Sequence, residues 1–195
     1  GGICLYSSDK ILKDSIDIFN LIIKEFLTIF KRKYIYAEQI FKSSVDSLTG
    51  LYNRNQFDIG LEQEFNRAKR YNTPFSIAMI DIDHFKNIND NFGHQFGDYV
   101  LKEIAQIIQH VFRKTDIVYR YGGEEIVIIM PETTTEKAHL PLNKLRNNIA
   151  THDFDGKNVT ISVGIADYTD TLKSKSEIVK NADIKLYQAK ESGRN

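Results

Sequence analysis

The sequence has 195 residues, of which 26 are basic and 26 are acidic, so its formal net charge is zero. A chain without an excess of either charge lacks the overall field that attracts nucleic acids or membrane surfaces, and we expect no nucleic-acid partner. Its 42% of hydrophobic and 27% of charged residues are ordinary for a globular protein. The length suffices for one substantial domain and an appendage.

The single cysteine, Cys4, excludes an internal disulfide and a cysteine-rich zinc site. This fits a reducing compartment, and the cytoplasm is the expected location. No stretch approaches the roughly 18 uncharged apolar residues that cross a membrane, because Lys24, Glu25 and Lys31 interrupt the most apolar region. We therefore expect no membrane segment.

Residues 11–45 contain neither glycine nor proline and predict one long amphipathic helix. Apolar residues in it keep the alternating spacing of four and three that is typical of a coiled-coil seam, interrupted at Lys33. The seam consists of Leu12, Ile16, Phe19, Ile23, Phe26, Phe30, Ala37 and Ile40. Two interpretations stay open: the helix pairs with a second copy of the chain, or it packs against another domain. Ile18, Ile22 and Ile29 widen the stripe, which favours an additional packing partner.

Turn-forming residues at 46–51 end this helix, and we place a domain boundary there, between residues 1–45 and 46–195. Beyond it, hydrophobic periodicity predicts five helices and four strands. The helices are expected at 54–71, 84–92, 95–113, 133–150 and 175–191, and the strands at 75–82, 116–121, 125–130 and 158–167. This order predicts a mixed α/β sheet, in which crossover helices make parallel pairs and a Gly-Gly hairpin makes one antiparallel pair.

Acidic residues lie at the ends of two predicted strands. Asp81 and Asp83 end the first strand, whereas Glu124 and Glu125 follow the Gly-Gly turn. If both strands belong to one sheet, Asp81 and Glu124 converge at one edge, and neighbouring carboxylates repel each other unless a cation neutralises them. Such oxygen ligands favour Mg²⁺ or Mn²⁺. Each acid alone is also typical of a solvated turn, so this prediction rests on their combination.

Other residues could hold a nucleotide at this place. Lys86, Lys190 and Arg194 supply the cations that a triphosphate needs, and the last two lie four apart on one helix face. Beside Asn89, the carboxylate of Asp98 can accept from both N1–H and the 2-amino group of guanine, where adenine has no donor. Taken singly, the cations are typical of a surface and Asp98 of a helix start.

Several motifs also occur in the order typical of one family. They are DSLTGLYNR at 46–54, DIDHFKNIND at 81–90, GHQFGD at 93–98, RYGGEE at 120–125, AD at 182–183 and LYQAK at 186–190. Over residues 46–195 the chain resembles the GGDEF domains, the diguanylate cyclases. The resemblance implies a palm-like fold with a ferredoxin-like core, and the condensation of two GTP into cyclic di-GMP with release of two pyrophosphates.

The resemblance also implies roles for individual residues. Asp81, the Ile82 carbonyl and Glu124 look like ligands of two Mg²⁺ or Mn²⁺ ions per active site, and Glu124 and Glu125 like the catalytic carboxylates. The implied substrate-binding residues are Phe85 and Lys86, Asn89 and Asp98 for guanine, and Lys190 and Arg194 for phosphate.

Such an enzyme acts with two GTP-bearing domains facing each other, so the resemblance implies a homodimer, joined by the helix at 11–45. Arg113 and Asp116 resemble the family's RxxD site, at which the product inhibits the enzyme. Residues 2–8 resemble the last strand of a GAF-type sensor, which we expect to precede the helix.

Ile126 departs from the family, which usually has Phe after the two acids, and we expect it to point into the core. The competing hypothesis is a catalytically weak domain that binds GTP or cyclic di-GMP as a receptor. Such domains typically lose a signature acid, whereas Asp81, Glu124 and Glu125 are all present.

Overall fold

The computed structural model describes residues 8–169, 171–172 and 174–195, and up to residue 43 it describes the side chains of residues 15–35. The chain divides into two compact units, residues 1–43 and 44–195. Of the predicted sensor strand at 2–8, residues 2–7 lie outside the described residues, and Ser8 begins the first helix. Within the described part of the chain, no helix combines the length and apolar character needed to span a membrane.

Helix α1 (Ser8–Ser44) is the long helix that the sequence predicts. At 37 residues it is about 55 Å long. Every side chain described between residues 15 and 35 is exposed. The seam residues Phe26 and Phe30 stack on each other with centroids 6.4 Å apart, yet are 66% and 63% exposed. The seam positions Leu12, Ala37 and Ile40 lie outside the described side chains.

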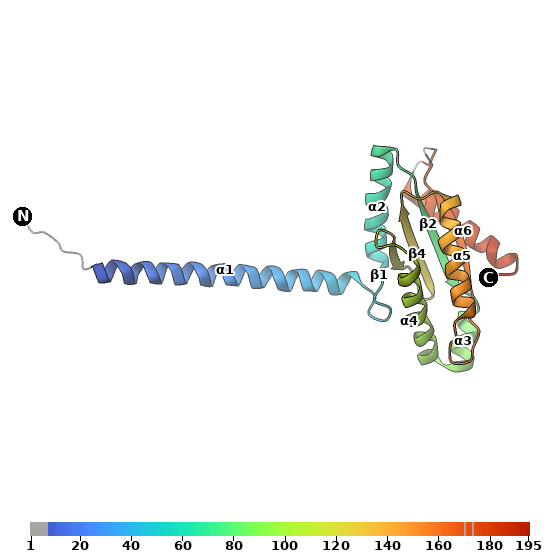
Figure 1. The fold of residues 1–195 in the computed structure, drawn as a ribbon, viewed down its shortest axis with the longest axis horizontal. Coiled ribbons are helices and arrows are strands. Elements are labelled where there is room, and N and C mark those ends of the chain that lie inside the picture. The colour runs from blue at the N-terminus through green and yellow to red at the C-terminus, as the bar shows by residue number, and fades with distance from the viewer. Residues whose placement is uncertain (1–7, 170, 173) are drawn as a thin grey trace, which may run out of the picture. The chain divides into compact units, whose positions relative to one another are not determined.

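The unit formed by residues 44–195 is built on one five-stranded sheet with the strand order β1-β3-β4-β2-β5. Helices flank this sheet (Figure 1). The strands are β1 (Tyr52–Asn53), β2 (Phe75–Ile82), β3 (Ile117–Arg120), β4 (Glu125–Pro131) and β5 (Ile161–Asp167). The helices of this unit are α2 (Arg54–Tyr71), α3 (Phe85–Phe92), α4 (His94–Val111), α5 (Thr135–Thr151) and α6 (Lys175–Glu191). The mixed sheet with flanking helices and a preceding long helix confirms the predicted fold class.

The prediction that crossover helices make parallel neighbours is wrong. Strand β2 pairs antiparallel with both β4 and β5, β3 pairs antiparallel with β4, and the parallel pair is β1 with β3. Strands joined by a crossover do run in the same direction, but another strand lies between them: β4 separates β2 from β3, and β2 separates β4 from β5. Connection length therefore determines strand direction here, but not which strands are neighbours.

Alternate residues of the central strands feed two separate cores. On one face, Ala78, Ile80 and Ile82 of β2 and Ile126, Ile128 and Met130 of β4 belong to a core that includes buried residues of α4 and α5. On the other face, Ile77 and Met79 of β2 and Val127 and Ile129 of β4 belong to a core with residues of α2 and α6. Because both faces are covered, every residue of β2 is buried. The packing on both faces therefore fixes the backbone at the end of β2, where Asp81 and Asp83 lie.

Helix boundaries follow local sequence signals. Helix α2 begins where the side chain of Asn53 accepts a hydrogen bond from the Gln56 N–H, and it ends at Asn72 in the left-handed conformation. The other predicted elements agree with the structure to within three residues. The two-residue strand β1 was not predicted, because so short a segment carries no periodicity.

Helix α6 lies unusually close to β5. A Cβ atom added to Gly164 would collide with the backbone of Ala182 and Leu186 on α6. The missing side chain thus lets the helix backbone settle on the strand, which positions Lys190 at the end of that helix.

Candidate active site

The Gly-Gly turn is a tight hairpin that carries the two signature acids. Its closure depends on the Glu125 carbonyl, which accepts hydrogen bonds from the N–H groups of Tyr121 (2.8 Å) and Gly122 (3.2 Å). The carboxylate of Glu125 folds back over the turn, into the space that a Cβ on Gly122 would occupy. The missing side chain of Gly122 thus leaves room for the Glu125 carboxylate over the turn.

A hollow of about 250 Å³ lies where β2 ends and α3 begins. Seven of the predicted site residues line it, from four different segments of the chain: Asp81, Ile82, Phe85, Lys86, Glu124, Lys190 and Arg194. Residues 84–87, at the start of α3, contribute to the same wall. Helix N-termini favour anions, so this wall suits phosphate groups.

The acids in and beside this hollow form a negatively charged cluster, in which Lys190 lies against Asp81. Asp81 and Glu125 lie opposite each other in the β2–β4 ladder, and Lys190 Nζ lies 2.8 Å from Asp81 Oδ1. Burial raises the pKa of Glu125, and the charges of Asp81 and Glu124 raise this pKa further, whereas Lys190 lowers it. The concentration of negative charge is the condition under which a cation binds.

These residues fit a divalent metal that is held jointly with a nucleotide. Among the described residues, no three His, Cys, Asp or Glu side chains form a complete metal cage. Mg²⁺ does not need one, because its sites commonly combine one or two carboxylates with waters and substrate phosphates. Asp81, the Ile82 carbonyl and Glu124 supply hard oxygen donors around one hollow, next to basic residues suited to phosphate.

Asp83 has a structural role that the sequence did not indicate. It is 4% exposed, and its carboxylate accepts hydrogen bonds from the hydroxyls of Thr160 (2.6 Å) and Ser162 (2.7 Å). Its backbone N–H also donates to the Thr160 carbonyl. Asp83 thus ties the end of β2 to the start of β5, and Arg194 Nε lies 4.0 Å from it. Its hydroxyl partners are far away in the sequence, so no local signal reveals them.

The two predicted guanine-binding residues lie outside the lining of this hollow, where α3 meets α4. Asn89 is half-buried, and its side chain occupies the space that a Cβ on Gly97 would need. Asp98 follows Gly97 in the first turns of α4 and is exposed. The structure therefore brings Asn89 to the residue that precedes Asp98. Phe85, which lines the hollow, lies against the same glycine.

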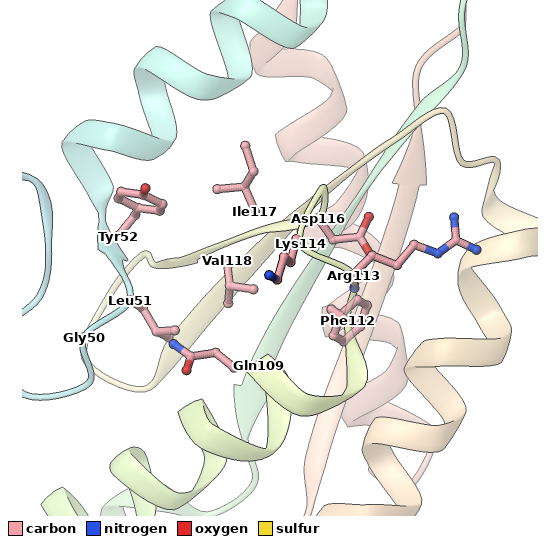
Figure 2. A pocket seen from close by; sticks show the side chains of 10 residues that line it. All are labelled: Gly50, Leu51, Tyr52, Gln109, Phe112, Arg113, Lys114, Asp116, Ile117 and Val118. Atoms are coloured by element: carbon pink, nitrogen blue, oxygen red, sulfur yellow. Dashed lines mark hydrogen bonds between the residues drawn. The ribbon is translucent and has the colours of Figure 1, made fainter.

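A separate hollow of about 430 Å³ contains the predicted inhibitory residues (Figure 2). Arg113 and Asp116 form a closed turn before β3: the Arg113 N–H donates to the Asp116 carboxylate, and the Asp116 N–H donates to the Arg113 carbonyl, both at 3.0 Å. Figure 2 shows the Arg113 guanidinium group directed away from Leu51 and Tyr52. The Arg113 side chain is exposed and therefore accessible to a ligand.

Burial raises the pKa of the Asp116 carboxyl, although the hydrogen bond and positive charge of Arg113 oppose the shift. The hydrogen bond and charge of Arg113 therefore do not fully offset the cost of burying the Asp116 carboxylate.

Ile126 behaves as predicted, since it is fully buried and belongs to the core on the α4 and α5 face.

Comparison with known families identifies the larger unit. A family model described as "Diguanylate cyclase, GGDEF domain" matches residues 43–195. The chain belongs to the GGDEF family. The matched residues include the whole five-stranded sheet described above.

Individual relatives agree with this assignment. Diguanylate cyclase DgcS of Shewanella oneidensis is 37% identical over 161 residues, which cover 82% of this chain and 54% of that protein. The crystal structure of the coiled coil and GGDEF domain of DgcB from Caulobacter crescentus, in complex with c-di-GMP, has a TM-score of 0.82 at 28% identity, and the match covers 90% of this chain and 96% of that one.

The active GGEEF domain of a diguanylate cyclase from Vibrio cholerae has a TM-score of 0.71 at 35% identity, and the match covers 73% of this chain and 92% of that one. Several curated relatives are much longer proteins. The present chain spans about a third to a half of their length.

Proposed function

We propose that this GGDEF domain is an active diguanylate cyclase, which condenses two GTP into cyclic di-GMP and releases two pyrophosphates. The observation that carries the proposal is the hollow at the end of β2, in which Asp81 and Glu124 lie beside Lys86, Lys190 and Arg194. Acids for a metal and cations for a triphosphate thus share one site. The similarity to cyclases such as DgcS supports the same reaction.

Asp81, the Ile82 carbonyl and Glu124 would hold two Mg²⁺ or Mn²⁺ ions together with the nucleotide phosphates. When bound, these ions supply Lewis-acid stabilisation of the attacking and leaving oxygens. Helix α6 contributes Lys190 to the same site, where its ammonium group already lies against Asp81. Lys190 thus partly neutralises the carboxylates before the substrate arrives.

The protein's own residues orient the reactants and handle the proton. Lys86, Lys190 and Arg194 neutralise and orient the triphosphate, so that the 3′-hydroxyl of a second GTP can attack the α-phosphorus in line. Glu124, with Glu125 beside it, draws the proton from that hydroxyl as the new P–O bond forms and the bond to pyrophosphate breaks. A second identical step closes the ring.

Base selection falls to Asn89 and Asp98. The Asp98 carboxylate is exposed and can accept hydrogen bonds from both the N1–H and the 2-amino group of guanine. Adenine has no donor at either position. The position of Asn89 against Gly97 supports a joint role for the two residues. We therefore expect GTP as the substrate rather than ATP, and the cytoplasm, where GTP is available, as the location.

Catalysis would require two copies of residues 46–195, and we propose that α1 brings them together as a coiled coil. The exposed apolar seam along residues 16–30 supports this, because its burial between two helices removes it from water. The DgcB structure, which contains a coiled coil, matches 90% of this chain and thus more than the GGDEF domain alone. Pairing raises the effective concentration of the two catalytic halves.

Product inhibition is the expected role of the second hollow. The Arg113 guanidinium can bind the phosphates or the guanine edge of cyclic di-GMP, and the Asp116 carboxylate can accept from guanine N–H groups. The open position of the Arg113 side chain supports this assignment (Figure 2).

The proposal is tested by incubating the purified chain with GTP and Mg²⁺ and detecting cyclic di-GMP by chromatography and mass spectrometry. Glu124→Gln should lower kcat by at least about 100-fold. The matched control is Glu132→Gln, the same change just beyond the far end of β4. A wild-type chain that binds GTP or cyclic di-GMP without forming product would instead be a receptor.

A further inference from the structure

The segment that directly follows α1 is attached to the strand that leads into the catalytic hairpin. Strand β1 pairs with β3 in parallel, which places Tyr52 opposite Tyr119 and Asn53 opposite Arg120. At the start of α2, Arg54 lies over the Tyr121 ring, 4.4 Å from its centroid, and donates to the Tyr121 hydroxyl at 3.3 Å. Arg120 and Tyr121, the two residues before Gly122, are therefore both held by the segment that contains Asn53 and Arg54.

Arg120 connects this segment to the tip of the hairpin. Its Nη1 group donates to Asp46 Oδ1 at 2.9 Å, whereas Nε and Nη2 donate to the Gly123 carbonyl at 3.2 and 2.8 Å. The two bonds to one carbonyl use the planar fork of the guanidinium, which a lysine does not have. Gly123 directly precedes Glu124, so this contact acts on the peptide that carries the acid.

Asp46 is itself held firmly. Its Oδ1 accepts from the Thr49 N–H and hydroxyl at 2.9 and 2.7 Å, and the backbone of Asp46 exchanges hydrogen bonds with Gly50 and Leu51. Burial by itself would raise the pKa of Asp46, yet its pKa is lowered overall, because the bonds from Thr49 and Arg120 favour the carboxylate. The pair is also shielded from water, since the Asp46 and Arg120 side chains are 23% and 17% exposed.

We propose that Asp46 and Arg120 are positioning residues for the cyclase reaction, which hold the Gly123 carbonyl and thereby fix Glu124 at the hollow. Asp46 lies two residues beyond the end of α1, so the pair also gives a covalent and hydrogen-bonded route from that helix to the catalytic acid. This inference rests on the proposed cyclase function for its kinetic consequence. Its structural consequence, a hairpin held by Asp46, can be measured without any activity.

The experiment compares Asp46→Ala and Arg120→Lys with the wild-type chain. Arg67→Gln is the matched control. It also removes an ion pair of a guanidinium group, here with Glu132, which follows the end of β4 that lies away from the hairpin. Arg120→Lys keeps the charge and is the milder change, so it stays informative if Asp46→Ala folds poorly. Circular dichroism and thermal unfolding establish that each variant is folded.

The structural measurement is hydrogen exchange at the amides of Tyr121 and Gly122, which close the hairpin. Exchange there should be about tenfold faster in both variants, since a hydrogen bond to a charged group contributes stabilisation of that order. Exchange in β2 should stay the same. Unchanged protection of the hairpin in folded Asp46→Ala and Arg120→Lys would overturn the proposal, whether or not the wild type makes cyclic di-GMP.

The kinetic measurement uses protein concentrations at which the wild type is fully associated. Both variants should lose on the order of 10- to 100-fold in kcat, with the KM for GTP changed much less, because misplacing a catalytic group slows the chemical step. Combining the two changes should cost little more than either alone. A rise in KM at constant kcat, or Arg120→Lys kinetics equal to wild type, would contradict a positioning role.

Discussion

Lys190 on α6 and Asp81 at the end of β2 form an ion pair, with Lys190 Nζ 2.8 Å from Asp81 Oδ1. The ammonium group thus occupies the neighbourhood in which a divalent cation and a phosphate would be bound. It has two opposing effects, since it repels a metal ion and attracts a nucleotide.

Lys190→Met should separate these two effects. We expect Mn²⁺ to bind more tightly to the nucleotide-free variant, because Asp81 and Glu124 lose a competing cation. The KM for GTP should rise about tenfold, because the phosphates lose a charged partner. Mn²⁺ titration by electron paramagnetic resonance and steady-state kinetics measure the two quantities. Lys185→Met, at an exposed position on the same helix, is the control, and a fall in Mn²⁺ affinity would contradict this account.

Gly97→Ala tests the proposed guanine site without removing a polar group. The new Cβ would collide with the Asn89 side-chain oxygen, which is the end of a flexible side chain and can move away. We therefore expect the unfolding temperature to change little and the affinity for GTP to fall about tenfold, since Asn89 is displaced. Calorimetric titration with GTP and a non-reactive GTP analogue measures this. Unchanged affinity would place guanine recognition elsewhere.

Asp116→Asn should relieve product inhibition without loss of stability. The pKa of Asp116 is raised, chiefly by burial, so its ionised form is disfavoured in the folded chain. Asparagine removes that buried charge and keeps an oxygen to accept from the Arg113 N–H.

The unfolding temperature of Asp116→Asn should therefore equal or exceed that of the wild type at neutral pH. The difference should vanish below the ordinary aspartate pKa, where the wild-type group is neutral in both the folded and unfolded states. The inhibition constant for cyclic di-GMP should rise by at least about tenfold. An inhibition constant equal to that of the wild type would exclude Asp116 from the product site.

Phe26→Lys tests whether α1 joins two copies. Phe26 is a seam residue and 66% exposed, so a charge there should disfavour burial between two helices. We expect the variant to sediment as a monomer at concentrations where the wild type is a dimer, and to recover activity as its concentration is raised. Thr28→Lys adds the same charge on the opposite side of the helix and is the control. Equal sedimentation of the two variants would argue against pairing of two copies through the seam.

The strongly periodic elements of this fold could be predicted from the sequence, whereas the neighbours in the sheet could not. Helix α2 and strand β2 have the predicted bounds, because their apolar residues repeat with the right period and clear turn residues flank them. Strand adjacency depends on which strand inserts between two others, and β4 lies between β2 and β3. Packing on both faces of the sheet determines which strands are neighbours, and this leaves no pattern within a short stretch of the sequence.

The candidate site shows the same division. The meeting of Asp81 and Glu124 at one hollow was predicted, because Asp81 lies at the end of β2 and Glu124 just before the start of the neighbouring strand β4. The bonds of Asp83 to Thr160 and Ser162, and of Arg120 to Asp46, were not predicted, because they join residues more than 70 positions apart. The sequence thus indicated the residues suited to the chemistry, but not those that hold them in place.

The most direct test of the central claim is the stoichiometry of the reaction. Cyclic di-GMP, pyrophosphate and remaining GTP are measured in one incubation of the wild-type chain with GTP and Mg²⁺. The cyclase account predicts one cyclic di-GMP and two pyrophosphates for every two GTP consumed, with both products formed at least about 100-fold more slowly by Glu124→Gln. Bound GTP that stays intact, with neither product released by the folded and associated wild-type chain, would contradict it.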